Sequence, residues 1–275
     1  MRFRDKLHSR QQFTGASLCV GLDPDLGRLP ASLLEKMSPD EAVRQFCVSI
    51  IESTASFASA YKLNLAFFEA LGRHGPAVLE DVLDVIPEEI ITIADAKRGD
   101  IGNSARFYAK ALLEDLNFDS ITVAPYMGSD SIRPFLMFSG KVAFVLARTS
   151  NPGGNDYQLL ETDGVPLYHR VAADCVRLGA ESPGAAGLVV GATDLDSLAS
   201  LRILCPETPF LIPGVGVQGA SASDVFAAAG SGPLLINSSR KIIYASTGPD
   251  FADAAATAAR SLCRELTEAA GRIVS

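Results

Sequence analysis

Short apolar segments alternate with longer helical patterns along the whole chain, and this alternation constrains the fold more than any other feature. Such a pattern is typical of βαβ units, in which helices join parallel strands. The eight candidate strands lie near residues 16–23, 59–64, 89–97, 120–125, 141–148, 187–193, 209–216 and 233–239. Eight strand-and-helix units in 275 residues predict an α/β fold, a (β/α)₈ TIM barrel, with a doubly wound open sheet as the alternative.

We therefore expect a single barrel domain over residues 1–275. The hydrophobic fraction of 48% is sufficient to fill one large core. A connecting helix is predicted over residues 104–116, where apolar side chains recur at helical spacing from Tyr108 to Leu116. Ser104 is placed to cap the amino end of this helix.

The charge balance of the chain indicates what kind of partner it has. A net charge of −8 disfavours a protein that binds nucleic acid along its phosphate backbone, whereas one small anionic substrate needs only a local positive pocket. The amino-terminal segment MRFRDKLHSR has no apolar stretch behind its charges, and no later apolar run approaches the roughly 18 residues that span a bilayer. We expect a cytoplasmic protein that binds neither membranes nor nucleic acid.

The cysteines and histidines do not suggest a metal site. The five cysteines are far apart in the chain, which predicts buried free thiols rather than disulfides or zinc ligands: Cys19, Cys47, Cys175, Cys205 and Cys263. The three histidines have polar neighbours and lack a second histidine at helical spacing, so we expect them to be exposed and unliganded: His8, His74 and His169.

Polar and turn-forming residues follow nearly every candidate strand at its carboxyl end. They are Asp23, Lys62, Asp95 to Asp100, Thr149 and Ser150, Gly214 to Gln218, and Ser238 to Arg240. In a TIM barrel the carboxyl ends of the strands meet at one rim, where active sites are assembled. This rim is therefore the predicted location of the functional site.

The third candidate strand ends in an Asp-x-Lys-x-x-Asp pattern formed by Asp95, Lys97 and Asp100. Asp95 and Lys97 share strand parity, so we expect them to face the same side. A surface cluster of ion pairs is the alternative. Lys62 interrupts the apolar second strand, and a buried lysine requires a nearby carboxylate, so we expect Asp95 and Asp100 to be its partners. Alternatively, Lys62 extends from the rim to solvent and has no role.

A glycine-rich turn from Pro213 to Gly219 and the segment from Ser238 to Arg240 follow the seventh and eighth candidate strands. Phosphate sites of TIM barrels are frequently built at these two positions from backbone N–H groups and a basic side chain. The glycines could equally be ordinary turn formers.

These segments together resemble the orotidine 5′-phosphate decarboxylase family. The matching segments are GLDPD, AYKLN, DAKRGDIGNS, VGAT, PGVGVQG and SSRKIIYA, in the family's order across almost the whole chain, and the long loop RTSNPGGNDYQ resembles the longer bacterial subgroup. The resemblance implies decarboxylation of orotidine 5′-phosphate to uridine 5′-phosphate, the last step of de novo pyrimidine nucleotide synthesis, without a metal or cofactor.

The resemblance also implies roles for individual residues. Lys62, Asp95, Lys97 and Asp100 would form a charged catalytic network in which Lys97 donates the proton. Asp100 and Ile101 would reach into the neighbouring subunit's site, which makes the enzyme a homodimer with composite active sites.

The substrate would be bound by residues at the remaining matched positions. The resemblance places Asp23 at the ribose hydroxyls, Ser150 at the pyrimidine edge, and Gln218 with Arg240 at the phosphate, and adds Ile101, Ser104, Pro213 and Ser239 to the binding set. The chain departs from the family pattern at Gly102 and Ser104, where proline and threonine are frequent, and at Ser239, where glycine is common.

Two other functions fit parts of the pattern. A related magnesium-dependent decarboxylase or aldolase of sugar phosphates would share the Asp-x-Lys-x-x-Asp strand but would not need a charge at Lys62. A barrel that only senses nucleotides would keep Gln218 and Arg240 but would not need four alternating charges.

Overall fold

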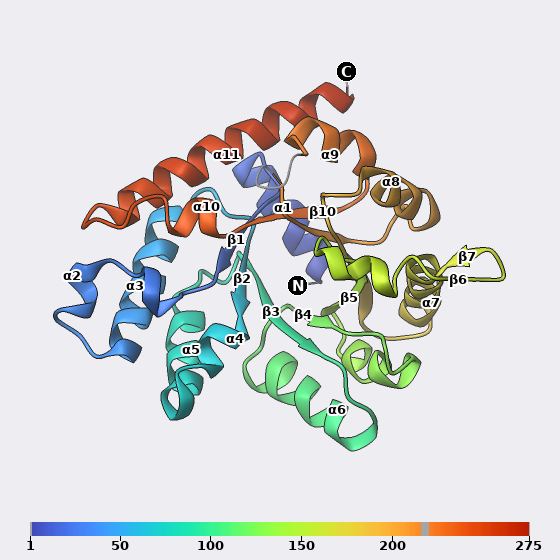
Figure 1. Cartoon of the computed structure of the whole chain (residues 1–275), viewed down its shortest axis with the longest axis horizontal. Coiled ribbons are helices and arrows are strands. Elements are labelled where there is room, and N and C mark those ends of the chain that lie inside the picture. The colour runs from blue at the N-terminus through green and yellow to red at the C-terminus, as the bar shows by residue number, and fades with distance from the viewer. Residues whose placement is uncertain (1, 216–219, 275) are drawn as a thin grey trace. The chain divides into compact units, whose positions relative to one another are not determined.

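The computed structural model describes residues 2–215 and 220–274 and contains an eight-stranded closed barrel, in the order β1-β10-β9-β8-β5-β4-β3-β2 (Figure 1). Each strand overlaps one of the eight predicted strands, so the predicted (β/α)₈ fold is confirmed. The strands are β1 (Leu18–Leu22), β2 (Ala60–Asn64), β3 (Ile91–Arg98), β4 (Ser120–Val123), β5 (Val142–Arg148), β8 (Ala185–Val190), β9 (Phe210–Pro213) and β10 (Leu234–Ser238).

Helices connect these strands, and a short antiparallel pair, β6 (Glu161–Thr162) and β7 (Val165–Pro166), forms a separate sheet. The helices are α1 (Phe3–Thr14), α2 (Ala31–Leu34), α3 (Pro39–Thr54), α4 (Leu65–Glu69), α5 (Gly75–Asp84), α6 (Gly102–Ala109), α7 (Leu167–Ala180), α8 (Leu195–Leu204), α9 (Ala222–Ala229), α10 (Arg240–Ile243) and α11 (Phe251–Val274). Short 3₁₀ helices cover Leu26–Arg28, Gly72–His74, Ser129–Ser131, Arg133–Met137 and Pro152–Asp156.

The helix expected over residues 104–116 begins earlier and changes type. Helix α6 starts at Gly102 with Ile101 as its N-cap, and the chain continues as a π-helix over Lys110–Asp115. Gly102 has φ of +55°, a conformation that costs glycine little and starts the helix two residues before Ser104. The prediction that Ser104 caps this helix was therefore wrong.

Residues 4–96 and 238–267 form one compact unit, called here the first unit. Its strands β1, β2 and β3 pair in parallel, with Gly21 opposite Lys62 and Asn64 opposite Asp95. This register fixes which side chains of the three strands share a face.

Helix α3 shows how local sequence and packing cooperate in the first unit. Ser38 and Glu41 form a capping box around Pro39, which is favourable in the first helical turn. On the buried face, the ring of Phe46 stacks on Tyr244 and Phe251 at centroid distances of 5.7 and 5.3 Å. These contacts join α3 to the carboxyl end of α10 and to the start of α11.

The described residues within 2–3, 97–215, 220–237 and 268–274 form the other compact unit, called here the second unit. It contains the parallel pairs β4–β5, β5–β8, β8–β9 and β9–β10. Phe144 of β5 is fully buried and packs edge-on against Phe3 at 5.8 Å. The register of β5 against β8 shifts between Leu146 and Arg148, which marks a β-bulge at the carboxyl end of β5.

All five cysteines are free and buried, as predicted. Burial raises the pKa of Cys205 to about 11 and that of Cys19 and Cys175 to about 12, so these thiols stay protonated near neutral pH. His8 and His74 are exposed as expected, but His169 is half-buried, with its Nε2 2.9 Å from Ser200 Oγ.

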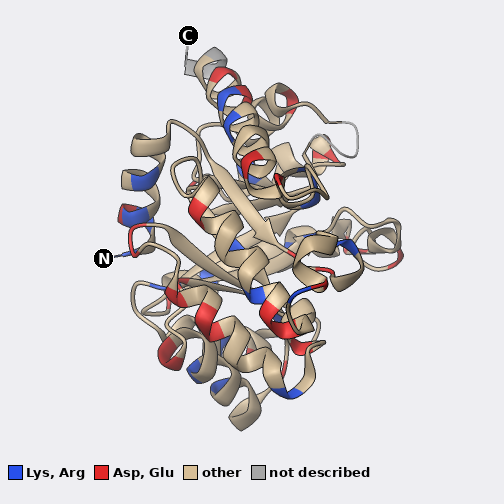
Figure 2. Ribbon diagram, turned by 90° about the vertical axis from the view of Figure 1, so that its left-hand side faces the viewer, with Lys and Arg blue, Asp and Glu red and all other residues tan. Residues whose placement is uncertain are grey.

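Charges of both signs are interspersed along the helices that Figure 2 displays. Within residues 2–215 and 220–274, no helix has the length and apolar character required to cross a membrane.

Candidate active site

Lys62 and Asp95 form a buried ion pair between β2 and β3. Asn64 is the register partner of Asp95, and Lys62 precedes Asn64 by two residues, so both charged side chains point to the same face. Lys62 Nζ lies 2.6 Å from Asp95 Oδ2, and the residues are only 6% and 9% exposed. The sequence prediction that a lysine in this strand requires a carboxylate partner is confirmed for Asp95.

Asp23 adds a second carboxylate to this pair. It follows β1, and its Oδ1 lies 3.8 Å from Lys62 Nζ, too long for a hydrogen bond. Asp23 Oδ1 is buried and has no hydrogen-bond donor within the described part of the chain. A buried carboxylate oxygen of this kind is costly unless a ligand supplies the donor, as a sugar hydroxyl would.

The two carboxylates control the charge of Lys62. Burial alone would lower the pKa of Lys62, but the charges of Asp95 and Asp23 and the hydrogen bond to Asp95 outweigh burial and raise it. Lys62 is therefore a fixed ammonium at neutral pH.

Lys97 occupies a strained position near the end of β3. Its φ is +45°, a left-handed conformation that costs a non-glycine residue about 1–3 kcal/mol and that concentrates at functional sites. Its backbone N–H donates to Thr122 Oγ1 at 2.9 Å, which holds the strand in this conformation. The side chain of Lys97 is exposed. Lys97 belongs to the second unit, so its predicted contact with Lys62 and Asp95 stays a prediction.

The residues after Lys97 form a polar turn with an apolar tip. Asp100 Oδ1 accepts a hydrogen bond of 2.7 Å from the N–H of Ile101, and Asp100 is half-buried. Ile101 is 47% exposed, and Ser104 is exposed in the first turn of α6. Further along α6, Phe107 and Tyr108 are also exposed, which leaves several large apolar side chains at the surface.

The predicted phosphate residues lie on two segments. Pro213 ends β9 and is half-buried, and Gly214 adopts φ of +95°, which the turn after the strand requires. Gln218 lies outside the described residues. Arg240 is exposed at the start of α10, and the buried Oγ of Ser239 has no hydrogen-bond partner in the parts of the chain that the structure describes.

Tyr244 was not predicted from the sequence, yet it ties α10 to the loop after β1. Its hydroxyl accepts a hydrogen bond of 2.6 Å from the N–H of Asp25 and donates one of 2.8 Å to the carbonyl of Asp23. Arg28 lies over the Tyr244 ring at 4.1 Å. Asp23 and the helix that begins at Arg240 are therefore linked within the first unit.

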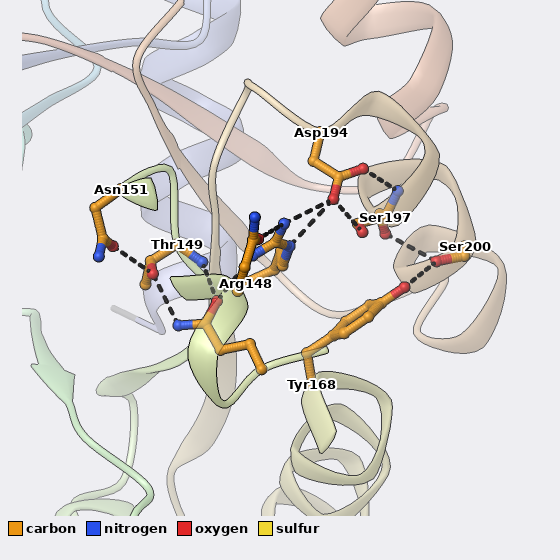
Figure 3. Close-up of polar contacts among 9 residues, drawn as sticks. Arg148, Thr149, Asn151, Tyr168, Asp194, Ser197 and Ser200 are labelled. Carbon is orange, nitrogen blue, oxygen red and sulfur yellow. Dashed lines mark hydrogen bonds and ion pairs between the residues drawn. The ribbon is translucent and has the colours of Figure 1, made fainter. Parts of the chain in front are cut away.

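Ser150 lies in the loop after β5 and lines a polar cavity of about 590 Å³ together with residues from β5 and from the loop before α8. Figure 3 shows that the guanidinium of Arg148 points toward Asp194 at the start of α8. Sequence reasoning selected Ser150 but missed Arg148 and Asp194. The only sequence signal was an arginine at the end of an otherwise apolar strand.

Comparison with known proteins identifies relatives over nearly the whole chain. Residues 16–256 match the family model described as the orotidine 5′-phosphate decarboxylase / HUMPS family. The chain is 46% identical to an orotidine 5′-phosphate decarboxylase of Flavobacterium johnsoniae, with 96% of each chain covered. It is 45% identical to the corresponding protein of Herpetosiphon aurantiacus, which covers 94% of this chain and 96% of that protein.

A solved structure supports the same assignment. The orotidine 5′-phosphate decarboxylase of Leishmania donovani is similar to this chain with a TM-score of 0.85 and 38% identity. The similarity covers 98% of this chain and 100% of the Leishmania chain.

Proposed function

The chain belongs to the orotidine 5′-phosphate decarboxylase / HUMPS family, and from this premise we propose that it converts orotidine 5′-phosphate to uridine 5′-phosphate with its own lysines and aspartates, without a metal or cofactor. The reaction belongs to pyrimidine nucleotide synthesis. The observation that carries the proposed mechanism is the buried Lys62–Asp95 pair, with a contact of 2.6 Å, in the strands that also lead to Lys97.

The reaction requires electrostatic stabilisation at one carbon. Loss of carbon dioxide from carbon 6 of the pyrimidine leaves an electron pair in the ring plane, where the ring's π-system cannot delocalise it. A fixed ammonium close to that carbon stabilises the developing carbanion and then supplies the proton that replaces the departed group. We assign both tasks to Lys97, and its strained backbone supports this assignment.

Lys62 and Asp95 would set the charge and position of the reacting groups. Asp95 holds the ammonium of Lys62 directly, and Lys97 follows Asp95 by two residues in β3. We propose that Asp95 also faces the carboxylate of the substrate, a like-charge contact that is relieved when carbon dioxide leaves. Asp100 would supply the fourth charge of the network.

The rest of the nucleotide would bind along the rim of the barrel. Asp23, whose buried Oδ1 lacks a hydrogen-bond donor among the described residues, is suited to ribose hydroxyls. We assign Arg240, Ser239, Pro213 and Gln218 to the phosphate, and Ser150 to the pyrimidine edge. Binding energy from a phosphate far from the reacting bond can close the site and exclude water.

We infer that the enzyme is a homodimer in which Asp100 and Ile101 complete the site of the partner subunit, with Ser104 in the first turn of the helix that follows. The exposed apolar side chains of Ile101, Phe107 and Tyr108 support an interface at α6.

We also propose that residues 1–275 form a single domain that works in the cytoplasm. The five free thiols support a reducing compartment. The net charge of −8 supports a small substrate rather than nucleic acid.

The decisive experiment is to mix chelator-treated protein with orotidine 5′-phosphate and follow the loss of orotate absorbance. We expect full turnover without added metal. Turnover that disappears with chelator and returns with magnesium would contradict the cofactor-free mechanism. Activity on a keto-sugar phosphate, present with magnesium and absent with chelator, would instead assign the chain to the magnesium-dependent branch of the superfamily.

A further inference from the structure

Arg148 is a buried cation at the carboxyl end of β5, next to the predicted base-binding residue Ser150. Arg148 is 7% exposed, and the β-bulge before it changes the direction in which the strand end points its side chains. Its Nε donates to Asp194 Oδ2 at 3.1 Å, its Nη1 to Gln158 Oε1 at 3.3 Å, and its Nη2 to Asn155 Oδ1 at 2.8 Å. Each guanidinium nitrogen is thus engaged by a protein oxygen, which suits a positioning role rather than direct contact with substrate.

The same residues hold both ends of the loop that contains Ser150. Gln158 accepts the N–H of Thr149 at 2.9 Å and donates to Thr149 Oγ1 at 2.8 Å. These hydrogen bonds join the first and last residues of the loop from Thr149 to Gln158. Arg148 donates to Gln158 at the end of this loop and to Asn155 within it.

Gly191, the residue after β8, packs closely against Ser150. The N–H of Gly191 donates to the carbonyl of Arg148 at 2.7 Å. A Cβ atom at position 191 would lie 2.8 Å from Ser150 N and 2.9 Å from Ser150 Cβ, which is closer than real contacts allow. Glycine at this position lets the backbone of Ser150 lie directly against β8.

Hydrogen bonds from Ser197 fix the side chain of Asp194, so Asp194 can hold Arg148 in place. Ser197 donates to it twice, from the backbone N–H to Oδ1 at 3.0 Å and from the hydroxyl to Oδ2 at 2.7 Å (Figure 3). Partial burial would raise the pKa of Asp194, but the hydrogen bonds from Ser197 and Arg148 lower it instead. Asp194 is ionised at neutral pH and pairs with Arg148.

We propose that the Arg148–Asp194 ion pair positions Ser150. The pair holds the loop so that the Ser150 hydroxyl reaches the edge of a pyrimidine base in the adjacent cavity. This inference rests on the proposed function, which assigns Ser150 to the base. The ion pair sets affinity for the base and leaves affinity for the ribose phosphate unchanged, because the phosphate residues lie on other segments.

The test compares two competitive inhibitors in each variant, uridine 5′-monophosphate and ribose 5-phosphate, which lacks the base. We expect Arg148→Met and Asp194→Asn to raise the Ki of uridine 5′-monophosphate about ten-fold, as for the loss of one hydrogen bond at the base. The Ki of ribose 5-phosphate should stay within about two-fold. Equal weakening of both inhibitors would overturn the proposal, because it indicates general damage to the site.

A double variant tests whether Arg148 acts through Ser150. In a Ser150→Ala background, Arg148→Met should add little further loss of affinity for uridine 5′-monophosphate, since the contact it positions is already absent. If the two substitutions raise the Ki by independent factors that multiply in the double variant, the proposal is overturned. If Ser150→Ala alone leaves the Ki of uridine 5′-monophosphate unchanged, Ser150 does not bind the base and this inference is wrong. Turnover of orotidine 5′-phosphate tests the proposed activity separately.

Arg202 provides a matched control. It is also 7% exposed and lies in α8, but it donates to backbone carbonyls, including those of Ala229 and Thr208. Arg202→Met should lower the thermal unfolding midpoint without changing either Ki. If Arg148→Met fails to fold, Asp194→Asn carries the test of the ion pair instead. The same selective loss of base affinity is expected, and an unchanged Ki for uridine 5′-monophosphate would overturn the proposal.

Discussion

The ammonium nitrogen of Lys62 lies 2.6 Å from a carboxylate oxygen of Asp95, and both residues are buried. Moving two charges out of water costs several kcal/mol for each ion, and their mutual attraction repays this cost only while both partners are present. The ion pair therefore adds little net stability, but removing either partner destabilises the fold strongly. Asp23, at 3.8 Å, is too distant to replace the lost hydrogen bond.

Asp95→Asn should lower the free energy of unfolding by about 3 kcal/mol, because it leaves the buried ammonium of Lys62 with Asp23 as its only described carboxylate neighbour. Urea unfolding monitored by circular dichroism measures this change. Asp174→Asn is the matched control: it breaks the exposed contact of 2.8 Å with Arg177 and should leave stability unchanged within error. Equal stability of Asp95→Asn and the wild type would contradict the argument.

The raised pKa of Lys62 predicts a specific dependence of stability on pH. The ordinary pKa of lysine is 10.5, and the folded protein holds the proton of Lys62 more tightly than the unfolded chain does. Protonation of Lys62 thus stabilises the fold fully below that pH, and this contribution is lost as the pH rises through the raised value. As the pH rises from about 10 to about 12, the wild type should lose more stability than Lys62→Met in urea unfolding. Parallel losses in the two proteins would contradict the prediction.

The strands of the barrel could be predicted because each is a short run of buried apolar residues with turn-forming residues at its end. The Lys62–Asp95 pair could also be predicted, since a lysine in an apolar strand has few ways to be satisfied. The strand pattern placed Asp23 at the rim, but its role came only from the family resemblance, and the lack of a hydrogen-bond donor to its Oδ1 becomes visible only in three dimensions.

Other features of the site depend on contacts that no local pattern contains. The left-handed conformation of Lys97 has no signal in the residue type, because lysine does not favour it, and it depends on Thr122, 25 residues away. Strand parity predicts side-chain direction only in a regular strand, and β3 is irregular at Lys97, one residue before its end. The Arg148–Asp194 pair joins residues 46 positions apart across a bulge.

Lys97→Ala should reduce kcat by at least about a thousand-fold, because it removes both the stabilising ammonium and the proton donor. Binding of uridine 5′-monophosphate should persist, which isothermal titration calorimetry can measure. Substantial turnover by this variant would remove Lys97 from the mechanism.

Lys97→Gly separates the chemical role of Lys97 from its backbone strain. It should be as inactive as Lys97→Ala but more stable than that variant by about 1 kcal/mol, since glycine adopts φ of +45° without strain. Urea unfolding of the two variants provides the comparison.

Arg240→Ala should selectively weaken the binding of phosphorylated ligands. Loss of a charge-assisted hydrogen bond to phosphate corresponds to roughly a ten- to hundred-fold rise in the Ki of uridine 5′-monophosphate, with no change for uridine. Inhibition kinetics measure both values. The neighbouring exposed Lys241 offers a matched control, and Lys241→Ala should have little effect. If Arg240→Ala leaves phosphorylated and unphosphorylated ligands equally bound, the phosphate site lies elsewhere.

Mixing two inactive variants tests whether Asp100 acts in the partner's site. Lys97→Ala and Asp100→Ala should each be inactive alone, because each lacks one charge of the network. In a mixed dimer, one site combines the intact Lys97 of one subunit with the intact Asp100 of the other, while the second site lacks both. After unfolding and refolding an equimolar mixture, half of the dimers are mixed, so about a quarter of wild-type activity should return. If activity stays at the level of the separate variants, Asp100 serves its own subunit and the composite site is wrong.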